Sequence, residues 1–492
     1  MALLHVHPDD MDSYRLFIKA KSLPAYRVRG RTIHVPDEYA NLLGRPSGNG
    51  RHVESEPHHD AFDYQRDISA LAVRKRKFAV FADCGLGKTL IFFDWCRHVS
   101  RVMPDRKVLI ISPLMVVSQT LLESTRFYRG DLPIKQVPSN ALDAWLNTEG
   151  GGIGITNYEA LKPEVRQGRL GALVVDESSM LKSHYGKWGR EIIRLGKGLD
   201  WKLALTGTPA PNDRVEYANH AVLLDQFPTV NAFLARYFVN KGQTQERWVL
   251  KPHALEPFYR SLSHWCIFLT NPATYGWRDN ARDIPPIHVH IHHVPLTGEQ
   301  EDAALSSSGQ LFATEVGGIT TRAMAGSIAK GVFRGKRIAT HKPSFIRDLV
   351  DSWPEESTII WCIYNGEQDL IEEQFPEAAC IRGETPFDVR EELIADFKTG
   401  RRRVLISKPK ILGFGLNLQI ATRQIFSGLQ DSYESYYQAV KRSNRIGSTR
   451  PLNVHIPVTE LEEPMVANVL RKAGRVQADT EEQERIFHAA RI

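Results

Sequence analysis

The chain has 492 residues, which exceeds what one hydrophobic core usually supports, so two or three domains are expected. With 42% hydrophobic and 24% charged residues, the composition is that of a soluble globular protein, and no apolar run is long enough to cross a bilayer. The 63 basic and 57 acidic residues leave a net charge of +6, which is compatible with a nucleic-acid partner but too small to argue for one.

The five cysteines are scattered, with no C-x-x-C pair and no spacing typical of a disulfide framework. The chain does not open with a charged and then apolar leader segment. Together these features predict a protein of a reducing compartment, the cytoplasm.

Residues 1–55 predict a small N-terminal module. Apolar residues recur at helical spacing from Met11 to Lys21, and short β-type runs lie between Arg27 and Tyr39. The glycine- and proline-rich stretch that starts at Gly44 then predicts a flexible joint. The basic side chains of the module could touch phosphates, although a solvated surface explains them better. They are Arg15, Lys19, Lys21, Arg27, Arg29 and Arg31.

A strand, a glycine turn and a helix start follow one another between Phe78 and Leu90. Gly85 and Gly87 let the backbone N–H groups close around phosphate oxygens, because side chains there would block the approach. Lys88 brings a positive charge to the β- and γ-phosphates, and the Thr89 hydroxyl can ligate the Mg²⁺ that they carry. The segment therefore predicts a site for a nucleoside triphosphate.

Two further segments supply groups that such a site needs. The side chain of Gln65, just upstream of the loop, offers a donor and an acceptor that match the adenine edge. An apolar strand from Ala172 delivers Asp176 and Glu177 at its end. We assign Asp176 to the metal, together with Thr89, and Glu177 to the general base. An acidic helix cap would look similar, but the upstream phosphate loop favours catalysis.

Strand-like and helix-like segments alternate through this region, which predicts a parallel sheet. Such sheets bind ligands at the carboxyl ends of their strands. Ser112, Pro113, Thr156 and Asn157 follow two of these strands and are therefore candidate contacts to a polymer backbone. Turn and capping roles explain them about as well.

The run from Ile287 to Val294 alternates with period two, which places His288, His290 and His292 on one face of a strand. Three histidines could form a metal site. No cysteine or carboxylate with ligand spacing accompanies them, so a solvent-facing strand edge is favoured.

A second α/β series begins at Ser344 and ends near Arg442 and Arg445. Two arginines three residues apart on a helix project from one face. Such a pair can neutralise the charge that spreads over a phosphoryl group during its transfer. A basic solvated helix would look the same in isolation.

In this order, the motifs resemble those of the superfamily 2 helicases and translocases. The resemblance is closest to the SNF2-like branch and its short bacterial or phage relatives, and it covers about Asp60 to Val458. The motifs that carry it are Gln65, Ala82-x-x-Gly-x-Gly-Lys-Thr89, Ser112-Pro113, Asp176-Glu177, Thr206-Gly-Thr-Pro209, Gly415-x-Asn-x-Gln419 and Gln438-x-x-x-Arg-x-x-Arg-Ile-Gly447.

The family fold implies an α/β protein with two RecA-like lobes and a small N-terminal module. ATP and Mg²⁺ are the implied cofactors, with Lys88, Glu177, Arg442 and Arg445 in catalysis and Asn417 near the ribose. Three further residues would couple hydrolysis to lobe movement: Thr206, Thr208 and Gln438. The predicted limits are 1–55 for the module, 56–283 for lobe 1, 284–342 for a linker or insertion, 343–460 for lobe 2, and 461–492 for a helical tail packed on lobe 2.

Two motifs depart from the family pattern at three positions. Ala82 stands where the phosphate loop usually has its first glycine, and Ser178-Ser179 replaces the Ala-His that follows the two carboxylates in many relatives. The histidine that couples ATP to nucleic acid in those relatives is therefore absent here. Neither change removes a catalytic group.

The prediction is an ATP-dependent DNA helicase or translocase that binds single- or double-stranded DNA with little sequence preference. One alternative moves on duplex DNA without separating its strands, and another is a nucleotide-dependent clamp or adaptor with slow hydrolysis. Residue chemistry does not distinguish DNA from RNA, since only the resemblance favours DNA. No membrane partner is predicted.

Overall fold

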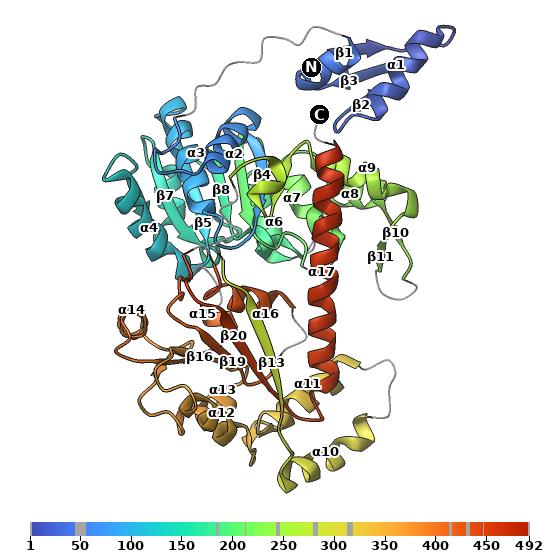
Figure 1. The fold of residues 1–492 in the computed structure, drawn as a ribbon. Helices are drawn as coiled ribbons and strands as arrows, with labels where there is room; N and C mark the ends of the chain where they lie inside the picture. Colours follow the sequence, from blue (N-terminus) through green and yellow to red (C-terminus); the bar gives the residue numbers. More distant parts are fainter. Residues whose placement is uncertain are drawn as a thin grey trace. The chain divides into compact units, whose positions relative to one another are not determined.

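The computed structural model describes residues 2–44, 56–183, 186–211, 213–242, 247–278, 284–311, 318–412, 416–429, 433–445 and 447–490. The chain forms two compact units, Met1–Arg278 with Asp479–Ile492, and Asp279–Ala478. Each unit contains a large parallel sheet (Figure 1). Every helix among the described residues is too short or too polar to span a bilayer.

The N-terminal module of unit 1 is a three-stranded antiparallel sheet in the order β1-β3-β2 with a helix packed on it. Its elements are β1 (Ala2–His5), α1 (Met11–Lys21), β2 (Arg27–Arg29), β3 (Thr32–Val35) and the 3₁₀ helix η1 (Asp37–Leu43). Alternate residues of β3 point into a small apolar core, as the period of a strand requires. That core contains Leu4, Ala20, Leu23, Ile33, Val35, Tyr39 and Leu43.

In the described part of unit 1, seven parallel strands follow in the order β12-β4-β9-β8-β5-β7-β6. They are β4 (Lys77–Ala82), β5 (Lys107–Ser112), β6 (Ile134–Gln136), β7 (Gly152–Asn157), β8 (Leu170–Asp176), β9 (Trp201–Thr206) and β12 (Cys266–Leu269). The central strands are nearly continuous apolar runs because helices cover both of their faces. Their carboxyl ends therefore meet at one edge of the sheet.

The helices of this unit pack on the sheet or on one another. They are α2 (Asp63–Lys75), α3 (Lys88–Val102), α4 (Leu114–Tyr128), α5 (Leu142–Asn147), α6 (Lys187–Leu195), α7 (Tyr217–Leu223), α8 (Val230–Tyr237) and α9 (Leu255–Leu262). Short 3₁₀ helices and one hairpin complete it: η2 (Tyr158–Ala160), η3 (Ser178–Leu181), η4 (Arg214–Glu216), η5 (Pro252–Ala254), η6 (Pro272–Tyr275), β10 (Phe238–Asn240) and β11 (Trp248–Leu250).

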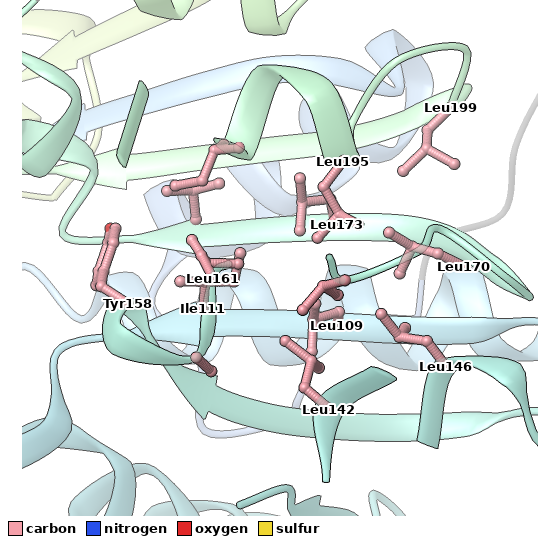
Figure 2. Close-up of a cluster of buried hydrophobic side chains, with 14 of the residues drawn as sticks. Leu109, Ile111, Leu142, Leu146, Tyr158, Leu161, Leu170, Leu173, Leu195 and Leu199 are labelled. Atoms are coloured by element: carbon pink, nitrogen blue, oxygen red, sulfur yellow. The ribbon is translucent and has the colours of Figure 1, made fainter. Parts of the chain in front are cut away.

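Figure 2 shows the apolar core on one face of this sheet. Leu109 of β5 and Leu173 of β8 are fully buried beneath Leu142 and Leu146 of α5 and Leu195 of α6. Burying a leucine side chain contributes about 1.5–3 kcal/mol. This layer holds the neighbouring strands β5 and β8 together below the point where their polar ends emerge.

Unit 2 has a six-stranded parallel sheet in the order β13-β20-β19-β16-β18-β17. Its strands are β13 (Ile287–His293), β16 (Thr358–Trp361), β17 (Ala379–Cys380), β18 (Val404–Ser407), β19 (Arg423–Phe426) and β20 (Leu452–Val458), with the hairpin β14 (Val332–Phe333) and β15 (Lys336–Arg337). Its helices are α10 (Gly298–Leu311), α11 (Gly318–Ala329), α12 (Lys342–Asp351), α13 (Asn365–Glu372), α14 (Phe387–Lys398), α15 (Pro409–Leu412) and α16 (Tyr433–Val440).

The segment 284–342, predicted as a linker or insertion, instead begins with a strand of this sheet. β13 pairs in parallel with β20 over seven residues and forms the sheet edge. The alternating histidines explain why the segment looked peripheral, since an edge strand need not be apolar on both faces. His292 and His455 are hydrogen bonded at 3.0 Å.

The C-terminal segment is one helix, α17 (Glu463–Ala490), drawn in red in Figure 1. The prediction that it packs on the second lobe is wrong for its last part, because Asp479–Ile492 belongs to unit 1, whereas the part up to Ala478 belongs to unit 2. The Glu484 carboxylate accepts hydrogen bonds at 2.8 Å from the backbone N–H of Thr270 and at 2.5 Å from its hydroxyl. The ring of Phe487 packs edge-on against Phe268.

A buried ionic cluster joins three parts of unit 2: Lys330, Lys342 at the start of α12, and Glu462, the residue before α17. Glu462 is 1% exposed and accepts hydrogen bonds from the ammonium groups of Lys330, at 2.5 Å, and Lys342. Lys342 also donates to the carbonyl oxygen of Ser427, at 2.5 Å. Burial alone would raise the pKa of Glu462, but the two lysines outweigh it and lower the pKa, so the carboxylate stays ionised.

Glu462→Gln should destabilise unit 2 by about 3–5 kcal/mol, because it leaves two buried ammonium groups without their counter-charge. The change should appear as a lower denaturant midpoint for the unfolding of this unit. Limited proteolysis at each denaturant concentration would measure the unfolded fraction. Glu463→Gln is the matched control, since Glu463 is exposed and its contact with His293 is 3.4 Å long. Equal effects of the two substitutions would contradict the assignment.

Candidate functional site

The loop between β4 and α3 has the backbone shape that its sequence predicts. Gly85 and Gly87 adopt positive φ angles of 91° and 65°, which other residues rarely adopt. A Cβ at Gly87 would lie 2.0 Å from Nε2 of Gln65, so space as well as conformation requires glycine there. The Lys88 ammonium folds back over the loop and donates to the carbonyl oxygens of Ala82, at 2.8 Å, and Asp83, at 3.2 Å.

Gln65, on the first turn of α2, is 2% exposed and holds this loop. Its Nε2 donates to the carbonyl oxygens of Leu86 and Gly87, each at 3.3 Å, while its Oε1 accepts from the backbone N–H of Phe62 at 2.8 Å. Tyr64 also donates to Leu86 at 3.2 Å. The structure therefore gives Gln65 a positioning role, and its reading of adenine stays a prediction.

Asp176 ends β8 and is tied to the neighbouring strand β5. The Ser112 hydroxyl, at the end of β5, donates to Oδ2 of Asp176 at 2.8 Å. The Tyr158 hydroxyl donates to the backbone carbonyl oxygen of Asp176 at 2.6 Å. Burial and the negative charge of Glu177 raise the pKa of Asp176 to about 6. A bound cation would stabilise the ionised form of this carboxyl, which burial and Glu177 disfavour.

Glu177 is held in an unusual conformation by two hydroxyls. Its backbone is left-handed, with φ 53° and ψ 51°, which strains a residue with a side chain. Its Oε1 accepts hydrogen bonds from Oγ1 of Thr206 at 2.8 Å and from Oγ of Ser179 at 3.0 Å. The backbone N–H of Thr208 in turn donates to Oγ1 of Thr206 at 3.1 Å. The carboxylate is thus linked to the loop after β9.

These residues fit the group that the phosphate loop implies, a nucleoside triphosphate with Mg²⁺. The half-buried carboxylate of Asp176 and the hydroxyl of Thr89 are hard oxygen donors of the kind that Mg²⁺ prefers. At Gly85 and Gly87 no Cβ atom blocks the approach of a phosphate to the backbone N–H groups of the loop, and the Lys88 ammonium lies beside the loop. We therefore expect Lys88, Thr89 and Asp176 to hold these groups.

One buried histidine of the site is not apparent from the sequence. His220, on α7, lies 2.9 Å from Ser178 through its Nε2 and the Ser178 hydroxyl. Burial lowers the pKa of His220 to about 4, so its ring is neutral. The residue lies 42 positions beyond Ser178, and no motif marks it. This contact helps to fix Ser178, the residue that follows the two carboxylates.

The four candidate polymer contacts lie at strand ends, and three of their side chains are already engaged. Ser112 donates to Asp176 as described. Thr156 is 2% exposed and donates to the carbonyl oxygen of Val137 at 2.8 Å. Asn157 caps η2 by accepting from Ala160 N–H at 3.1 Å, and Pro113 precedes α4. Binding of a polymer by these residues stays a prediction.

In unit 2 the two arginines follow α16 and do not lie on it, because that helix ends at Val440. They therefore do not share a helical face as predicted. Nε of Arg442, which is buried, donates to the carbonyl oxygen of Gln438 at 3.0 Å. Arg445 donates to the side-chain oxygen of Asn417. The structure brings Asn417 and Arg445 together, whereas Gly415 lies outside the described residues.

Comparison with known proteins gives a match to the helicase conserved C-terminal domain over residues 341–447. The chain is 24% identical over 439 residues to ATP-dependent DNA helicase DDM1 of Arabidopsis thaliana, covering 75% of this chain and 55% of that protein. It is 24% identical over 432 residues to putative protein p41 of Acyrthosiphon pisum secondary endosymbiont phage 1, covering 80% and 91%. A solved SWI2/SNF2 ATPase core of Sulfolobus solfataricus in complex with dsDNA aligns with TM-score 0.41 and 20% identity over 89% of this chain and 96% of that chain.

The chain spans between 12% and 55% of the length of three of the curated relatives that it matches. The matched domain model covers part of unit 2, where Asn417, Gln438, Arg442 and Arg445 lie. The two matches of more than 400 residues extend beyond this part of the chain.

Asp176→Asn should stabilise unit 1 at pH 8 but not at pH 4, in buffer free of divalent cations. The native pKa of about 6 is above the ordinary value of 3.8, so the folded state binds more protons than the unfolded state between these values. Stability contributed by this group is present below pH 4 and is lost as the pH rises through 6. Thermal melting at both pH values measures the difference.

Asp143→Asn is a control with the opposite sign. Hydrogen bonds from Arg166 lower the pKa of Asp143 to about 2, so its stabilising effect is present above its ordinary pKa. The substitution should slightly lower stability at pH 8. A destabilising effect of Asp176→Asn at pH 8 would contradict the raised pKa of the Asp176 carboxyl.

Proposed function

We propose that this chain, which belongs to the superfamily 2 helicases of the SNF2-like type, is a nucleic-acid-stimulated ATPase that couples ATP hydrolysis to movement on DNA. The observation that carries the proposal is the hydrogen bond from Thr206 to Glu177. It ties a candidate general base, just after β8, to the end of β9, and Thr208 N–H extends the link to the loop that follows. A change in either loop therefore changes the orientation of the carboxylate.

The residues divide the chemistry among them. When bound, Mg²⁺·ATP supplies the phosphoanhydride bond that breaks and the cation that stabilises the transferred phosphoryl group. Lys88 and the N–H groups of the loop bind phosphate oxygens, and Thr89 and Asp176 hold the cation. Glu177 orients a water molecule and accepts its proton at a carboxylate oxygen. Thr206 and Ser179 fix that carboxylate by their two hydrogen bonds.

Arg442, Arg445, Gln438 and Asn417 enter the proposal through the family motif. Arginine guanidinium groups stabilise the charge of a phosphoryl group in flight, and a contribution from a separate unit would tie hydrolysis to a domain motion. The structure supports the pairing of Arg445 with Asn417. If the arginines contribute in this way, ATP hydrolysis by unit 1 without unit 2 would be slow.

DNA is the proposed track. A relative that aligns over 75% of this chain is named a DNA helicase. We expect grip to come mainly from phosphate contacts, with little sequence preference and marked salt sensitivity. Strand separation and movement on duplex DNA without separation both fit this proposal.

Glu177→Gln should abolish the hydrolysis of ATP that a nucleic acid stimulates, because the amide cannot accept the proton of the attacking water. Steady-state phosphate release would be measured without nucleic acid and with single-stranded DNA, duplex DNA or RNA. We expect one polymer to raise turnover severalfold in the wild type, and that polymer identifies the track.

Glu159→Gln is the matched control, since Glu159 is exposed on η2, and its turnover should equal that of the wild type. Hydrolysis that is absent, or indifferent to every polymer, would reject the motor. The nucleotide-dependent clamp or adaptor would then be the better account.

Thr206→Val should reduce polymer-stimulated turnover by roughly 10- to 100-fold, because a hydrogen bond to a charged group is worth about 1.5–3 kcal/mol. ATP binding should change much less, since the hydrogen bond that the Thr206 hydroxyl donates goes to Glu177, the candidate general base. Thr206→Ser keeps the hydroxyl and should retain most of the activity. The idea fails if valine and serine behave alike, which single-turnover hydrolysis and nucleotide titration would reveal.

A further inference from the structure

The N-terminal module contacts the rest of unit 1 through a polar latch, the contacts of Glu38 and Tyr39 with Lys75 and His264. Glu38 of η1 accepts hydrogen bonds from the Lys75 ammonium at 2.7 Å and lies 3.0 Å from Nδ1 of His264. The hydroxyl of Tyr39 lies 3.1 Å from the same nitrogen. Burial would raise the pKa of Glu38, but His264 and Lys75 outweigh it and lower the pKa to about 2.

Beside this latch, the module and the α7–α9 region line an open cavity of about 210 Å³. The module contributes Tyr26, Arg27 and His34, and the α7–α9 region contributes Phe227 and Arg236. This volume is below the roughly 300–1,000 Å³ of pockets that enclose a whole small molecule. It suits one base or one phosphate group of a longer chain.

The charge of the cavity wall is positive. Arg27 and Arg236 are exposed, and within the described ranges neither guanidinium pairs with a carboxylate. Asp225 also lines the cavity, but its Oδ2 lies 2.8 Å from both the Lys77 and the Lys202 ammonium groups. Two lysines offset that one carboxylate, so the two arginines are left to attract an anion.

Aromatic rings accompany these arginines. The Arg236 guanidinium lies 5.5 Å from the ring centre of Tyr26, on the module, and 5.8 Å from that of Phe227. It is thus held between rings from both parts of the unit. Arginines that follow a backbone, together with rings that stack on bases, are the combination that binds single-stranded nucleic acid without sequence preference.

We propose that this cavity is a second nucleic-acid contact, at which Arg27 and Arg236 bind a phosphate of a single strand and Tyr26 or Phe227 stacks on its base. The inference rests on the proposed function, because it takes nucleic acid as the partner. Asp225, in the cavity wall, contacts Lys77 and Lys202 at the amino ends of β4 and β9, whereas Lys88 and Glu177 follow the carboxyl ends of β4 and β8. The module is therefore a part of the grip on the strand.

The test is binding of a fluorescent single-stranded oligodeoxynucleotide by the full chain over a series of salt concentrations. Each phosphate contact contributes about 0.7 to the slope of log affinity against log salt for a single strand. Arg27→Gln with Arg236→Gln should reduce the slope by roughly 0.7, the share of one phosphate contact, and Arg27→Gln alone should reduce it by part of that amount. ATP hydrolysis without nucleic acid should be unchanged in both variants.

Arg29→Gln is the matched control, because Arg29 lies on the same strand β2, is exposed and does not line the cavity. The single Arg27→Gln variant keeps the test decisive if loss of Arg236 disturbs packing, which a melting curve would show. An unchanged slope in Arg27→Gln, or an equal loss in Arg29→Gln, would overturn the inference.

Two other outcomes separate this inference from the proposed function. If the wild type binds no nucleic acid, both fail. If it binds DNA and hydrolyses ATP faster with it, but the Arg27 and Arg236 variants lose only binding to polyglutamate, the cavity takes an acidic peptide. The inference then fails and the proposed function stands.

Discussion

The placement of two half-buried carboxylates at the end of one strand is the constraint on which the site depends. Asp176 is costly to ionise where it lies, and Glu177 is held in a strained backbone conformation. Both are supported by hydroxyls from neighbouring strands, Ser112 from β5 and Thr206 from β9. A parallel sheet brings these strand ends to one edge, so the fold supplies the partners that the carboxylates need.

The local part of this arrangement could be predicted from the sequence. The strand before Lys88, the positive-φ glycines and the carboxylates after β8 are each encoded by a few neighbouring residues. The parallel α/β architecture also followed, because buried parallel strands are written as continuous apolar runs. The match to the helicase conserved C-terminal domain over residues 341–447 agrees with the motifs that were quoted from that part of the chain.

Features that depend on distant partners could not be predicted in this way. His220 and Ser178 meet only because α7 packs behind the end of β8. The alternation of residues 287–294 predicts a strand with a solvent-facing edge, which β13 confirms, but its pairing with β20 in the second sheet depends on residues far along the chain. α16 ends before Arg442 although the residues that follow it are compatible with a helix. In each case tertiary contacts decide what local propensity leaves open.

The latch between Glu38 and Lys75 affects how the first 44 residues can be studied by truncation. Lys75 and His264 belong to the α/β part of unit 1, yet their counter-charge comes from the module. A protein shortened to begin after the joint would keep both basic groups at a newly uncovered surface that also contains the ring of Phe227. Its loss of solubility or activity would report the exposed face and not the task of the missing residues. Point substitutions at the cavity wall leave the module in place and avoid this confusion.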